Sequence, residues 1–386
     1  MRLGIDRVSE NPHLLDASKR WALMANSAST DSYFRLSPCV LKDAGVNLKA
    51  ILSPEHGFFQ HKEYMEPVEG GERVCGLPVV SLYGKDTSDL KIPEGLLEDL
   101  DGVIFDLQDV GTRCYTYLAH LVLIMRQLQG TQVQIVVLDR PNPLGRTVEG
   151  APPQDALSSF VGISKVAHRH GMTAGEYALF VKHLEGLDVK LKVITLEGYS
   201  YGLWRGPAST WVAPSPNMNT FETALVYPGM VFFEGLNVSE GRGTPYPFLV
   251  FGAPFFGDPE VFADSLNRLR IPGVVFRPVR FRPSWNKFAG ELCSGAFIHV
   301  VDSSAFKPLR MGLRLVRYLL EEFPQVTLVE GPYEYDPRPP YVLLAGTLQI
   351  IQYLEGKVAF TKLEEFLEEE EGLFSEKIQQ VRMYHA

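Results

Sequence analysis

One local pattern occurs five times between residues 21 and 143: a short apolar run is followed directly by polar, turn-forming residues. Apolar runs of this length, bounded by Gly, Pro, Asn or Asp, are typical of buried strands. In open α/β sheets, ligands bind in the crevice beyond the carboxyl ends of the strands. The pattern therefore indicates a small-molecule site on an α/β scaffold, and an enzyme is the leading interpretation. The polar segments begin at Asn26, Pro54, Tyr83, Asp106 and Asp139.

Helical patterns lie between and after these runs. Thr173 stands three residues before Glu176, a spacing that predicts a capping box at a helix start. Strands that alternate with helices predict βαβ units and a mainly parallel sheet. We expect helices at 31–44, 90–100, 116–129 and 173–184, and strands at 134–138 and 189–196.

The composition changes after residue 204. From 204 to 256, Pro, Gly and aromatic residues are dense, which predicts a long functional segment without regular structure. Beyond it the patterns predict a second, smaller domain that begins near residue 227, so the domains are expected at 1–226 and 227–386. In the second domain we expect helices at 258–269, 311–322 and 362–384, and a strand at 297–301.

Charge and composition narrow the classes of partner. The 386 residues carry a formal net charge of -9, which argues against nucleic acid, whose phosphates favour clustered Lys and Arg. No stretch approaches the roughly 18 apolar residues of a membrane helix. Residues 1–6 lack the apolar segment of a secretory signal, so the chain as given is expected in the cytoplasm. Trimming of a longer natural N-terminus would instead make it secreted or periplasmic.

Cysteine spacing and missing motifs exclude several chemistries. The four cysteines are far apart, without CxxC spacing, so we expect free or buried thiols and no disulfide framework. Dinucleotide-binding, P-loop, zincin and nucleophile-elbow motifs are missing, and we expect no cofactor. A metal site built from Glu55, His56 and Asp106 stays open as an alternative, because ligands can come from separate strand ends. The cysteines are Cys39, Cys75, Cys114 and Cys293.

A carboxylate and an imidazole stand together in the segment 53–59, at Glu55 and His56. Cleavage of a glycosidic bond needs a proton donor at the leaving oxygen, and a carboxyl with a raised pKa is the usual donor. Phe58 and Phe59 offer apolar surroundings that raise such a pKa. The structural alternative is that Glu55 caps the following turn and His56 bonds a backbone carbonyl.

The segment 105–117 combines Asp106, Gln108, Asp109 and Arg113 with two tyrosines, Tyr115 and Tyr117. Strand alternation places Asp106 and Gln108 on one face. Arg113 is a candidate for a bidentate grip on an anionic substrate group, and the tyrosines are candidates for stacking on a sugar ring. The alternative is a helix cap at Asp109 with an internal Asp–Arg pair.

Two further segments contribute candidates. In 139–143, Arg140 and Asn142 are fixed by two prolines, and a buried pair or Asx turn explains them equally well. His170 precedes the helix expected at 173, where an anion is favoured. The glycine-rich loop 234–244 offers Asn237, Glu240 and Arg242, and its alternative is an ordinary turn with an internal Glu–Arg pair.

At these segments the chain resembles the NamZ-like exo-β-N-acetylmuramidases. The resemblance continues in order from the first expected strands into the start of the second domain. Phe59-Gln60 departs from the Arg-Gly-like pair that the family pattern suggests. The matching strings are PEHGF at 54–58, SLYGK at 81–85, FDLQDVGTRCYTY at 105–117, LDRPNPLG at 138–145, RHGMTAGE at 169–176, PSPNM at 214–218, TALVYPG at 223–229 and EGLNVSEGRGT at 234–244.

The resemblance implies a Rossmann-like N-terminal domain that carries most of the site and a smaller α/β (α+β) domain that contributes a loop to it. It also implies release of β-linked N-acetylmuramic acid from the non-reducing end of peptidoglycan fragments, with Glu55 as general acid. Two alternatives remain open: a non-catalytic muropeptide- or sugar-binding protein, and a metal-dependent hydrolase or deacetylase.

The expected site residues follow from these segments. The catalytic candidates are Glu55, His56, Asp106, Asp109 and Glu240. The candidates for substrate binding are Asn26, Tyr83, Gln108, Arg113, Tyr115, Tyr117, Arg140, Asn142, His170, Asn217, Asn237 and Arg242. Arg113 and Arg242 are the expected partners of the lactyl carboxylate of muramic acid.

Overall fold

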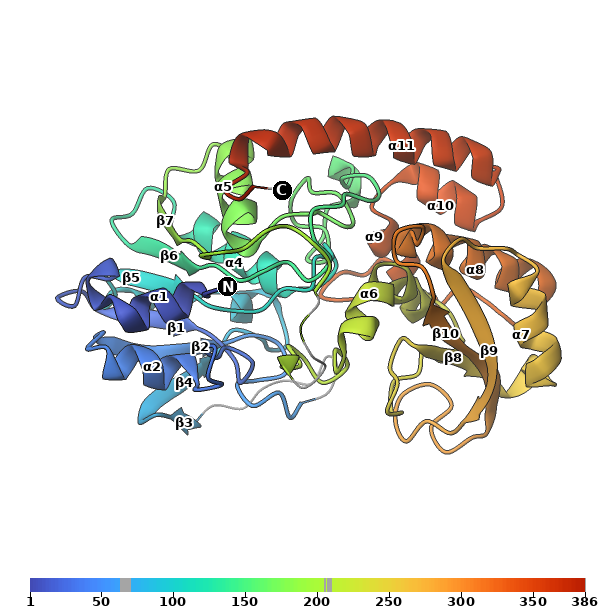
Figure 1. The fold of residues 1–386 in the computed structure, drawn as a ribbon, viewed down its shortest axis with the longest axis horizontal. Helices are drawn as coiled ribbons and strands as arrows, with labels where there is room; N and C mark the ends of the chain where they lie inside the picture. Colours follow the sequence, from blue (N-terminus) through green and yellow to red (C-terminus); the bar gives the residue numbers. More distant parts are fainter. Residues whose placement is uncertain (63–70, 205, 207–209, 386) are drawn as a thin grey trace.

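The chain forms two domains that lie side by side (Figure 1). The structure is a computed structural model and describes residues 1–62, 71–204, 206 and 210–385. The N-terminal domain is built on a seven-stranded sheet, and the smaller C-terminal domain is built on a three-stranded sheet. The fold class expected from the sequence is therefore confirmed. The boundary proposed near residue 227 falls inside helix α6 (Phe221–Met230).

The large sheet has the strand order of a doubly wound fold. Its order is β3-β4-β2-β1-β5-β6-β7, and all neighbouring pairs except β3–β4 are parallel. The chain progresses outward in one direction from β1 and in the other from β5, so the topological switch point lies between these two strands. The strands are β1 (Trp21–Met24), β2 (Leu48–Ser53), β3 (Arg73–Val74), β4 (Leu77–Ser81), β5 (Gly102–Phe105), β6 (Gln134–Leu138) and β7 (Lys190–Ile194).

Alternating strand residues bury two separate cores. In β1, Ala22 and Met24 join the core that includes α4, whereas Trp21 and Leu23 join the core that includes α1 and α2. Apolar residues on both faces explain why these strands read as continuous apolar runs. The helices of this domain are α1 (Gly4–Glu10), α2 (Ser37–Asp43), α3 (Glu94–Leu97), α4 (Tyr117–Gln127) and α5 (Ala174–Glu185).

The register of the central strands sets where the polar segments emerge. Met24 of β1 pairs with Leu52 of β2 on one side and with Phe105 of β5 on the other. The three strands therefore end level with one another, and the residues that follow them leave the sheet at the same edge. This arrangement confirms that the polar segments after residues 25, 53 and 105 lie at one carboxyl edge of a parallel sheet.

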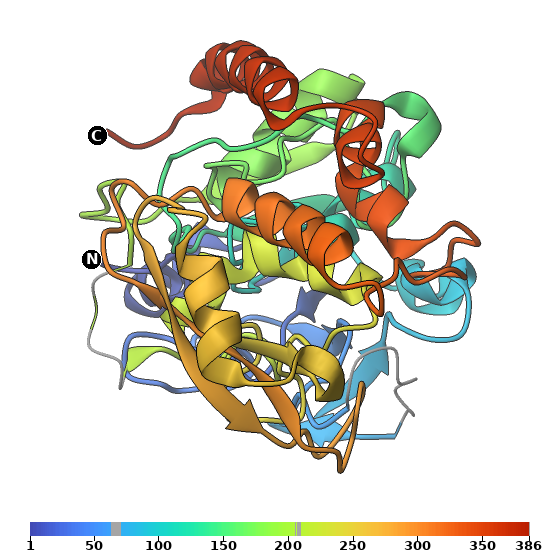
Figure 2. The same cartoon turned by 90° about the vertical axis from the view of Figure 1, so that its right-hand side faces the viewer.

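The C-terminal domain packs helices against an antiparallel sheet of order β8-β10-β9. Figure 2 shows α7 lying across the β9–β10 face. Helices α6 and α8 approach closely at Gly229 and Gly312, because neither glycine has a side chain. A Cβ on Gly312 would lie only 2.2 Å from the Gly229 carbonyl oxygen. The elements are β8 (Val250–Ala253), β9 (Val274–Phe281), β10 (Cys293–Val300), α7 (Pro259–Asn267), α8 (Pro308–Glu322), α9 (Pro340–Ala345), α10 (Leu348–Leu354) and α11 (Phe360–Lys377).

The last helix ties the two domains together. In Figure 1, α11 runs from the C-terminal domain back over the N-terminal domain and ends beside α5. The 3-10 helix after it (Ile378–Val381) contacts α5. Tyr384 accepts a hydrogen bond from the Leu196 backbone nitrogen at 3.0 Å and donates one to Asp139, behind the carboxyl end of β6. The end of the chain therefore belongs physically to the first domain.

Several predicted elements are confirmed, and others are wrong in informative ways. The capping box at Thr173 is present: Thr173 Oγ1 accepts from the Glu176 backbone nitrogen at 3.3 Å, and Glu176 Oε2 accepts from the Thr173 nitrogen at 3.0 Å. The helix expected at 31–44 begins only at Ser37. Asp31 instead accepts backbone hydrogen bonds from Tyr33 and Arg35, which forms a turn that competes with the helix.

The stretch 204–256 is not structureless, which corrects the sequence expectation. It contains α6, a 3-10 helix (Val231–Gly235) and β8, although residues 205 and 207–209 lie outside the described part. The helix expected at 90–100 shrinks to α3, preceded by a 3-10 turn (Thr87–Leu90). The sequence did not predict strand β9, because Pro278 and the arginines of this strand hide its apolar alternation. The proline is tolerated because β9 lies at the edge of the sheet.

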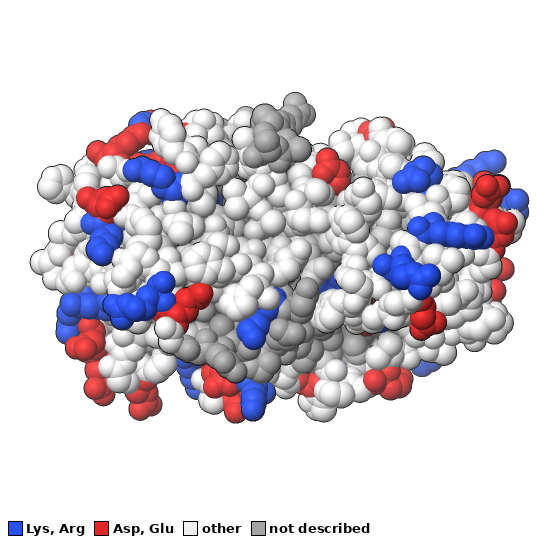
Figure 3. Space-filling model, turned by 90° about the horizontal axis from the view of Figure 1, so that it is seen from below, with Lys and Arg blue, Asp and Glu red and all other residues white. Residues whose placement is uncertain are grey.

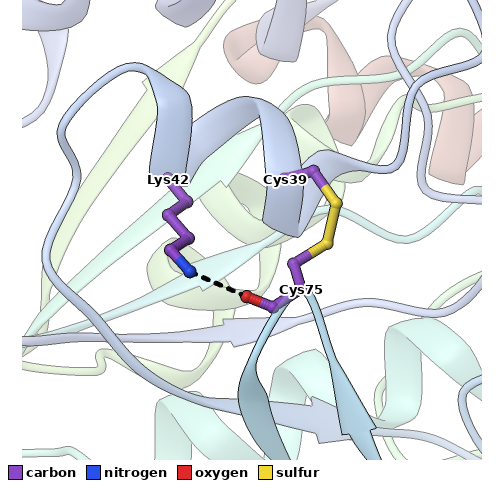
Figure 4. Close-up of a disulfide and its surroundings, with 3 residues drawn as sticks. All are labelled: Cys39, Lys42 and Cys75. Carbon is purple, nitrogen blue, oxygen red and sulfur yellow. Dashed lines mark hydrogen bonds between the residues drawn. A yellow bond between two sulfur atoms is a disulfide. The ribbon is translucent and has the colours of Figure 1, made fainter.

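The expectation of four free or buried thiols is wrong for two of them. Cys39 of α2 and Cys75, in the turn between β3 and β4, form a disulfide with a Cα–Cα distance of 5.5 Å (Figure 4). Lys42 Nζ donates to the Cys75 carbonyl oxygen at 3.0 Å in the same turn. Cys114 and Cys293 are free and buried, as expected. A separation of 36 residues without any motif gives no local signal for such a bridge.

Reduction of this disulfide is expected to destabilise the N-terminal domain. Closing a loop of this length in the unfolded chain stabilises the folded state by about 3–4 kcal/mol in the chain-entropy estimate. The free energy of unfolding, measured with and without reductant, should differ by that order. The double variant Cys39→Ser/Cys75→Ser is the control, because reductant should leave its stability unchanged. Equal stability of the oxidised and reduced protein would contradict the prediction.

Candidate active site

A narrow pocket between the two domains collects acidic and aromatic side chains. The N-terminal domain supplies the loop after β2 and the segment that leads into α4. The segment 215–218 and helix α6 line another part of it, and the chain after α6 supplies the remainder, including the turn at 333–336. The pocket is lined by Glu55, His56, Cys114, Tyr115, Thr116, Tyr117, Ser215, Asn217, Met218, Tyr227, Glu234, Arg242, Phe248, Tyr333 and Glu334.

Glu55 follows the end of β2 and points its carboxyl into this pocket. It is only 5% exposed, and its Oε2 accepts a hydrogen bond from Thr116 Oγ1 at 3.1 Å. Its Oε1 is buried and has no hydrogen-bond partner among the described residues. A buried carboxyl oxygen without a partner is unusual in folded proteins and marks a place where a substrate group can bind.

His56 shapes the loop that carries Glu55. Its backbone has a φ of 72°, in the left-handed region that non-glycine residues rarely adopt. The ring Nδ1 lies 2.9 Å from the Lys62 carbonyl oxygen. His56 therefore bonds its own loop, as the structural alternative proposed, while its ring also lines the pocket.

Glu334 is a second buried carboxyl in the pocket, and the sequence reasoning missed it. It is 2% exposed and accepts a hydrogen bond from the Tyr83 hydroxyl at 3.3 Å. Burial, together with the charges of Glu55 and Glu234, raises the pKa of Glu334 well above its usual range. The sequence signal was a lone Glu between Tyr333 and Tyr335, far along the chain from the other candidates.

The loop 234–244 brings a charge network to the pocket wall. Arg242 Nη2 donates to Glu234 Oε1 at 2.5 Å, and its Nε lies 3.2 Å from Glu240 Oε1. Glu240 also pairs with Lys287 Nζ at 3.0 Å. Arg242 and Glu234 line the pocket, whereas Glu240 lies behind them. The structure therefore does not bring Glu240 to the position expected of a second reacting carboxyl.

The two tyrosines expected to stack on a sugar are buried in the pocket wall. The rings of Tyr115 and Tyr117 are tilted against each other, with centroids 4.6 Å apart. Tyr117 donates to the Pro214 carbonyl oxygen at 2.6 Å, and Asn26 Nδ2 contacts the Tyr117 hydroxyl at 3.0 Å and the same carbonyl at 3.0 Å. Asn26 thus supports the wall from behind, while Asn217 lines the pocket itself.

Four predicted polar residues at the carboxyl edge are committed to internal contacts. Asp106 is fully buried and forms a bidentate pair with Arg140, with Nε–Oδ1 at 2.7 Å and Nη2–Oδ2 at 3.0 Å. Asp109 Oδ2 lies 3.1 Å from His170 Nε2, and both side chains are buried. The Asp106–Arg140 pair is an internal Asp–Arg pair, as the structural alternative described, whereas Asp109 pairs with His170. None of the four lines the pocket around Glu55.

The remaining candidates lie elsewhere. Arg113 donates to the carbonyl oxygens of Ala151 and Leu344, so it joins the two domains. Asn237 bonds the Gln325 carbonyl oxygen at 2.8 Å, away from the pocket. A separate cavity beyond β1, β5 and β6 is lined by Gln108, Arg140 and Asn142 together with Trp204 and Trp211.

Neither a metal-binding cluster nor a membrane-spanning helix occurs among the described residues. No three His, Cys, Asp or Glu side chains gather among them in a way that would hold a metal ion. Within the same part of the chain, no helix combines the length and apolar character needed to cross a bilayer. On the face shown in Figure 3, the described Lys and Arg side chains alternate with Asp and Glu and form no continuous basic track.

Fold and pocket together define a two-domain α/β protein with paired buried carboxyl groups between its domains. Residues 21–222 match the family described as "Exo-beta-N-acetylmuramidase NamZ, N-terminal", and residues 225–384 match its C-terminal counterpart. The chain therefore belongs to the NamZ family. It is 34% identical over 329 residues to the peptidoglycan beta-N-acetylmuramidase NamZ of Bacillus subtilis, covering 84% of this chain and 78% of that protein.

Two crystal structures of DUF1343 family proteins from Bacteroides fragilis share the fold. The first is 27% identical with a TM-score of 0.86, covering 99% of this chain and 98% of the other. The second is 26% identical with a TM-score of 0.75, covering 100% and 99%. The similarity extends over both domains of this chain.

Proposed function

We propose that this chain is a glycoside hydrolase that releases β-linked N-acetylmuramic acid from the non-reducing end of peptidoglycan fragments. Family membership and the named activity of the Bacillus subtilis relative support the reaction class. The observation that carries the proposal in this structure is the buried carboxyl of Glu55, whose Oε1 has no hydrogen-bond partner among the described residues.

The chemistry of the pocket suits a sugar. Hydrolysis of a glycosidic bond uses a pair of carboxyl groups on either side of the bond, and Glu55 and Glu334 come from different domains to line one pocket. Tyr115, Tyr117 and Tyr227 give it aromatic walls. Apolar walls with a few polar groups are typical of small-molecule sites.

The turn at 333–336 bears on whether the enzyme cleaves at the end or in the middle of a glycan. The turn at 333–336 belongs to the C-terminal domain, yet the Tyr335 hydroxyl donates to the Gly84 carbonyl oxygen at 3.2 Å in the N-terminal domain. The Tyr83 and Tyr335 rings also pack edge to face, with centroids 5.7 Å apart. The turn therefore bridges the domains beside the pocket, an arrangement that suits a terminal sugar better than the middle of a long glycan.

The direct test is product release. The purified protein is incubated with a chromogenic β-N-acetylmuramide and, in parallel, with the matching β-N-acetylglucosaminide. We expect release of the chromophore from the muramide at a much higher kcat/KM. Binding of the muramide without turnover would favour a sugar-binding protein instead. Activity that is lost with a chelator and restored by a metal would favour the metal-dependent alternative.

Arg242 is the proposed partner of the lactyl carboxylate that distinguishes muramic acid from glucosamine. Its guanidinium has five N–H donors, which gives it the capacity to hold a substrate carboxylate in addition to Glu234 and Glu240. Arg242→Gln should raise KM for the muramide by about 10–100-fold, because a hydrogen bond to a charged group is worth about 1.5–3 kcal/mol.

The comparison sugar provides the control for Arg242. Hydrolysis of the glucosaminide, which lacks the lactyl group, should change far less in the same variant. The exposed Arg280 serves as the matched control substitution, and Arg280→Gln should leave both sugars unaffected. Equal losses on both sugars in Arg242→Gln would show that Arg242 supports the fold or a contact common to both.

A further inference from the structure

The turn that carries Glu334 has an unfavourable backbone conformation. Tyr333 and Asp336 exchange two backbone hydrogen bonds, at 2.9 and 3.1 Å, around the central residues Glu334 and Tyr335. Both central residues have positive φ, 43° and 53°. Turns of this type normally place Asn-Gly at these positions. Non-glycine residues rarely adopt this conformation, because their Cβ crowds the following carbonyl oxygen.

Contacts with the N-terminal domain hold this turn in place. Tyr335 packs edge to face on Tyr83 and on Phe160, with ring centroids 5.7 and 5.6 Å apart. The Tyr83 hydroxyl also donates to Glu334 Oε2 at 3.3 Å. A disfavoured conformation that is fixed by its surroundings and aims a carboxyl into a pocket points to function.

We propose that Glu334 is the second catalytic carboxyl and the proton donor of the hydrolysis, an inference that rests on the glycosidase function proposed above. Glu334 faces Glu55 and Glu234 as negatively charged groups, Arg242 as the cation, and Tyr83 as a hydrogen-bond donor. Two carboxyl groups that share a buried pocket repel each other less when one of them keeps its proton.

The surroundings of Glu334 favour its protonated form. Burial and the charges of Glu55 and Glu234 raise its pKa, and the Tyr83 hydrogen bond and Arg242 oppose this only in part. An anionic muramyl substrate adds one more negative charge to the pocket and strengthens the effect. A buried carboxyl that keeps its proton is suited to donate it to a leaving oxygen. The sequence alone had assigned the acid to Glu55.

The carboxyl proton of Glu334 passes to the glycosidic oxygen as the bond between that oxygen and the anomeric carbon breaks. Glu55, as a carboxylate, stabilises the positive charge that develops at the sugar. A water molecule then forms the new bond to the anomeric carbon, and its released proton restores the acid form of Glu334.

Dependence on the leaving group tests this role. Glu334→Gln is compared with the parent protein on a muramyl-glucosamine disaccharide, whose leaving oxygen needs a proton, and on a dinitrophenyl muramide, whose leaving group does not. We expect kcat/KM to fall by about 10²–10⁴-fold on the disaccharide. The fall on the dinitrophenyl muramide should be much smaller. The alkaline decline of kcat/KM in the parent protein should also disappear in Glu334→Gln.

Two further variants complete the design. Glu330→Gln, an exposed carboxyl in the same segment, is the matched control and should behave as the parent protein. Glu55→Gln should be slow on both substrates. Near-normal cleavage of the disaccharide by folded Glu334→Gln, or equal losses on both substrates, would overturn the proposal. Leaving-group dependence in Glu55→Gln alone would return the acid role to Glu55. If the parent protein cleaves neither substrate, the glycosidase function itself fails.

Discussion

Glu55→Gln is expected to lower kcat/KM on muramides by about 10²–10⁴-fold, the range typical for loss of a catalytic carboxyl. The amide keeps the size and burial of the side chain and retains an oxygen that can accept from Thr116. It cannot carry the negative charge that faces the sugar. Thermal unfolding of the variant should therefore match the parent protein while turnover is nearly abolished.

The control for this prediction is a carboxyl on the same domain that lies outside the pocket. Glu94 at the start of α3 is exposed, and Glu94→Gln should leave turnover unchanged. Turnover within a few-fold of the parent protein in correctly folded Glu55→Gln would exclude Glu55 from the chemistry. The catalytic roles proposed for Glu55 and Glu334 would then have to be reassigned. The comparison of the disaccharide with the dinitrophenyl muramide would decide whether Glu334 acts in the reaction.

The fold of the N-terminal domain was predictable because each of its central strands is marked by a short apolar run in the sequence. Each run from residues 21 to 138 is apolar on both faces, as expected for a central strand of a doubly wound sheet. Polar residues at the strand ends then indicated the sheet edge from which Glu55 and His56 reach the pocket. The C-terminal domain was harder because Pro278 interrupts β9 and because the glycines of α6 and α8 signal close packing rather than loops.

The site was only partly predictable, for a physical reason. Asp, Arg and His residues at a strand end are used equally for catalysis and for buried ion pairs, and sequence cannot separate these uses. In this protein the Asp109 carboxyl contacts His170 inside the domain and stays away from the pocket around Glu55. Glu334 carries no neighbouring motif, and its environment arises only when the second domain folds against Tyr83 and Glu55.

Asp106→Ala is expected to destabilise the N-terminal domain by about 3–5 kcal/mol, because removal of one partner of a buried pair leaves the other charge unpaired. Arg140 is only 5% exposed and would lose both of its bonds to Asp106. Asp99→Ala is the matched control. The Asp99 side chain is 77% exposed and lies 3.1 Å from Arg20, so its loss should cost less than about 1 kcal/mol.

A double variant separates this structural role from the catalytic role that the sequence suggested for Asp106. Replacement of a buried pair by apolar residues of similar size is often close to neutral, so Asp106→Leu/Arg140→Met should recover much of the lost free energy of unfolding. Because neither residue lines the pocket around Glu55, the folded double variant should retain turnover. A correctly folded double variant that has lost turnover as severely as Glu55→Gln would place Asp106 or Arg140 in the reaction and would contradict the assignment made from their buried ion pair.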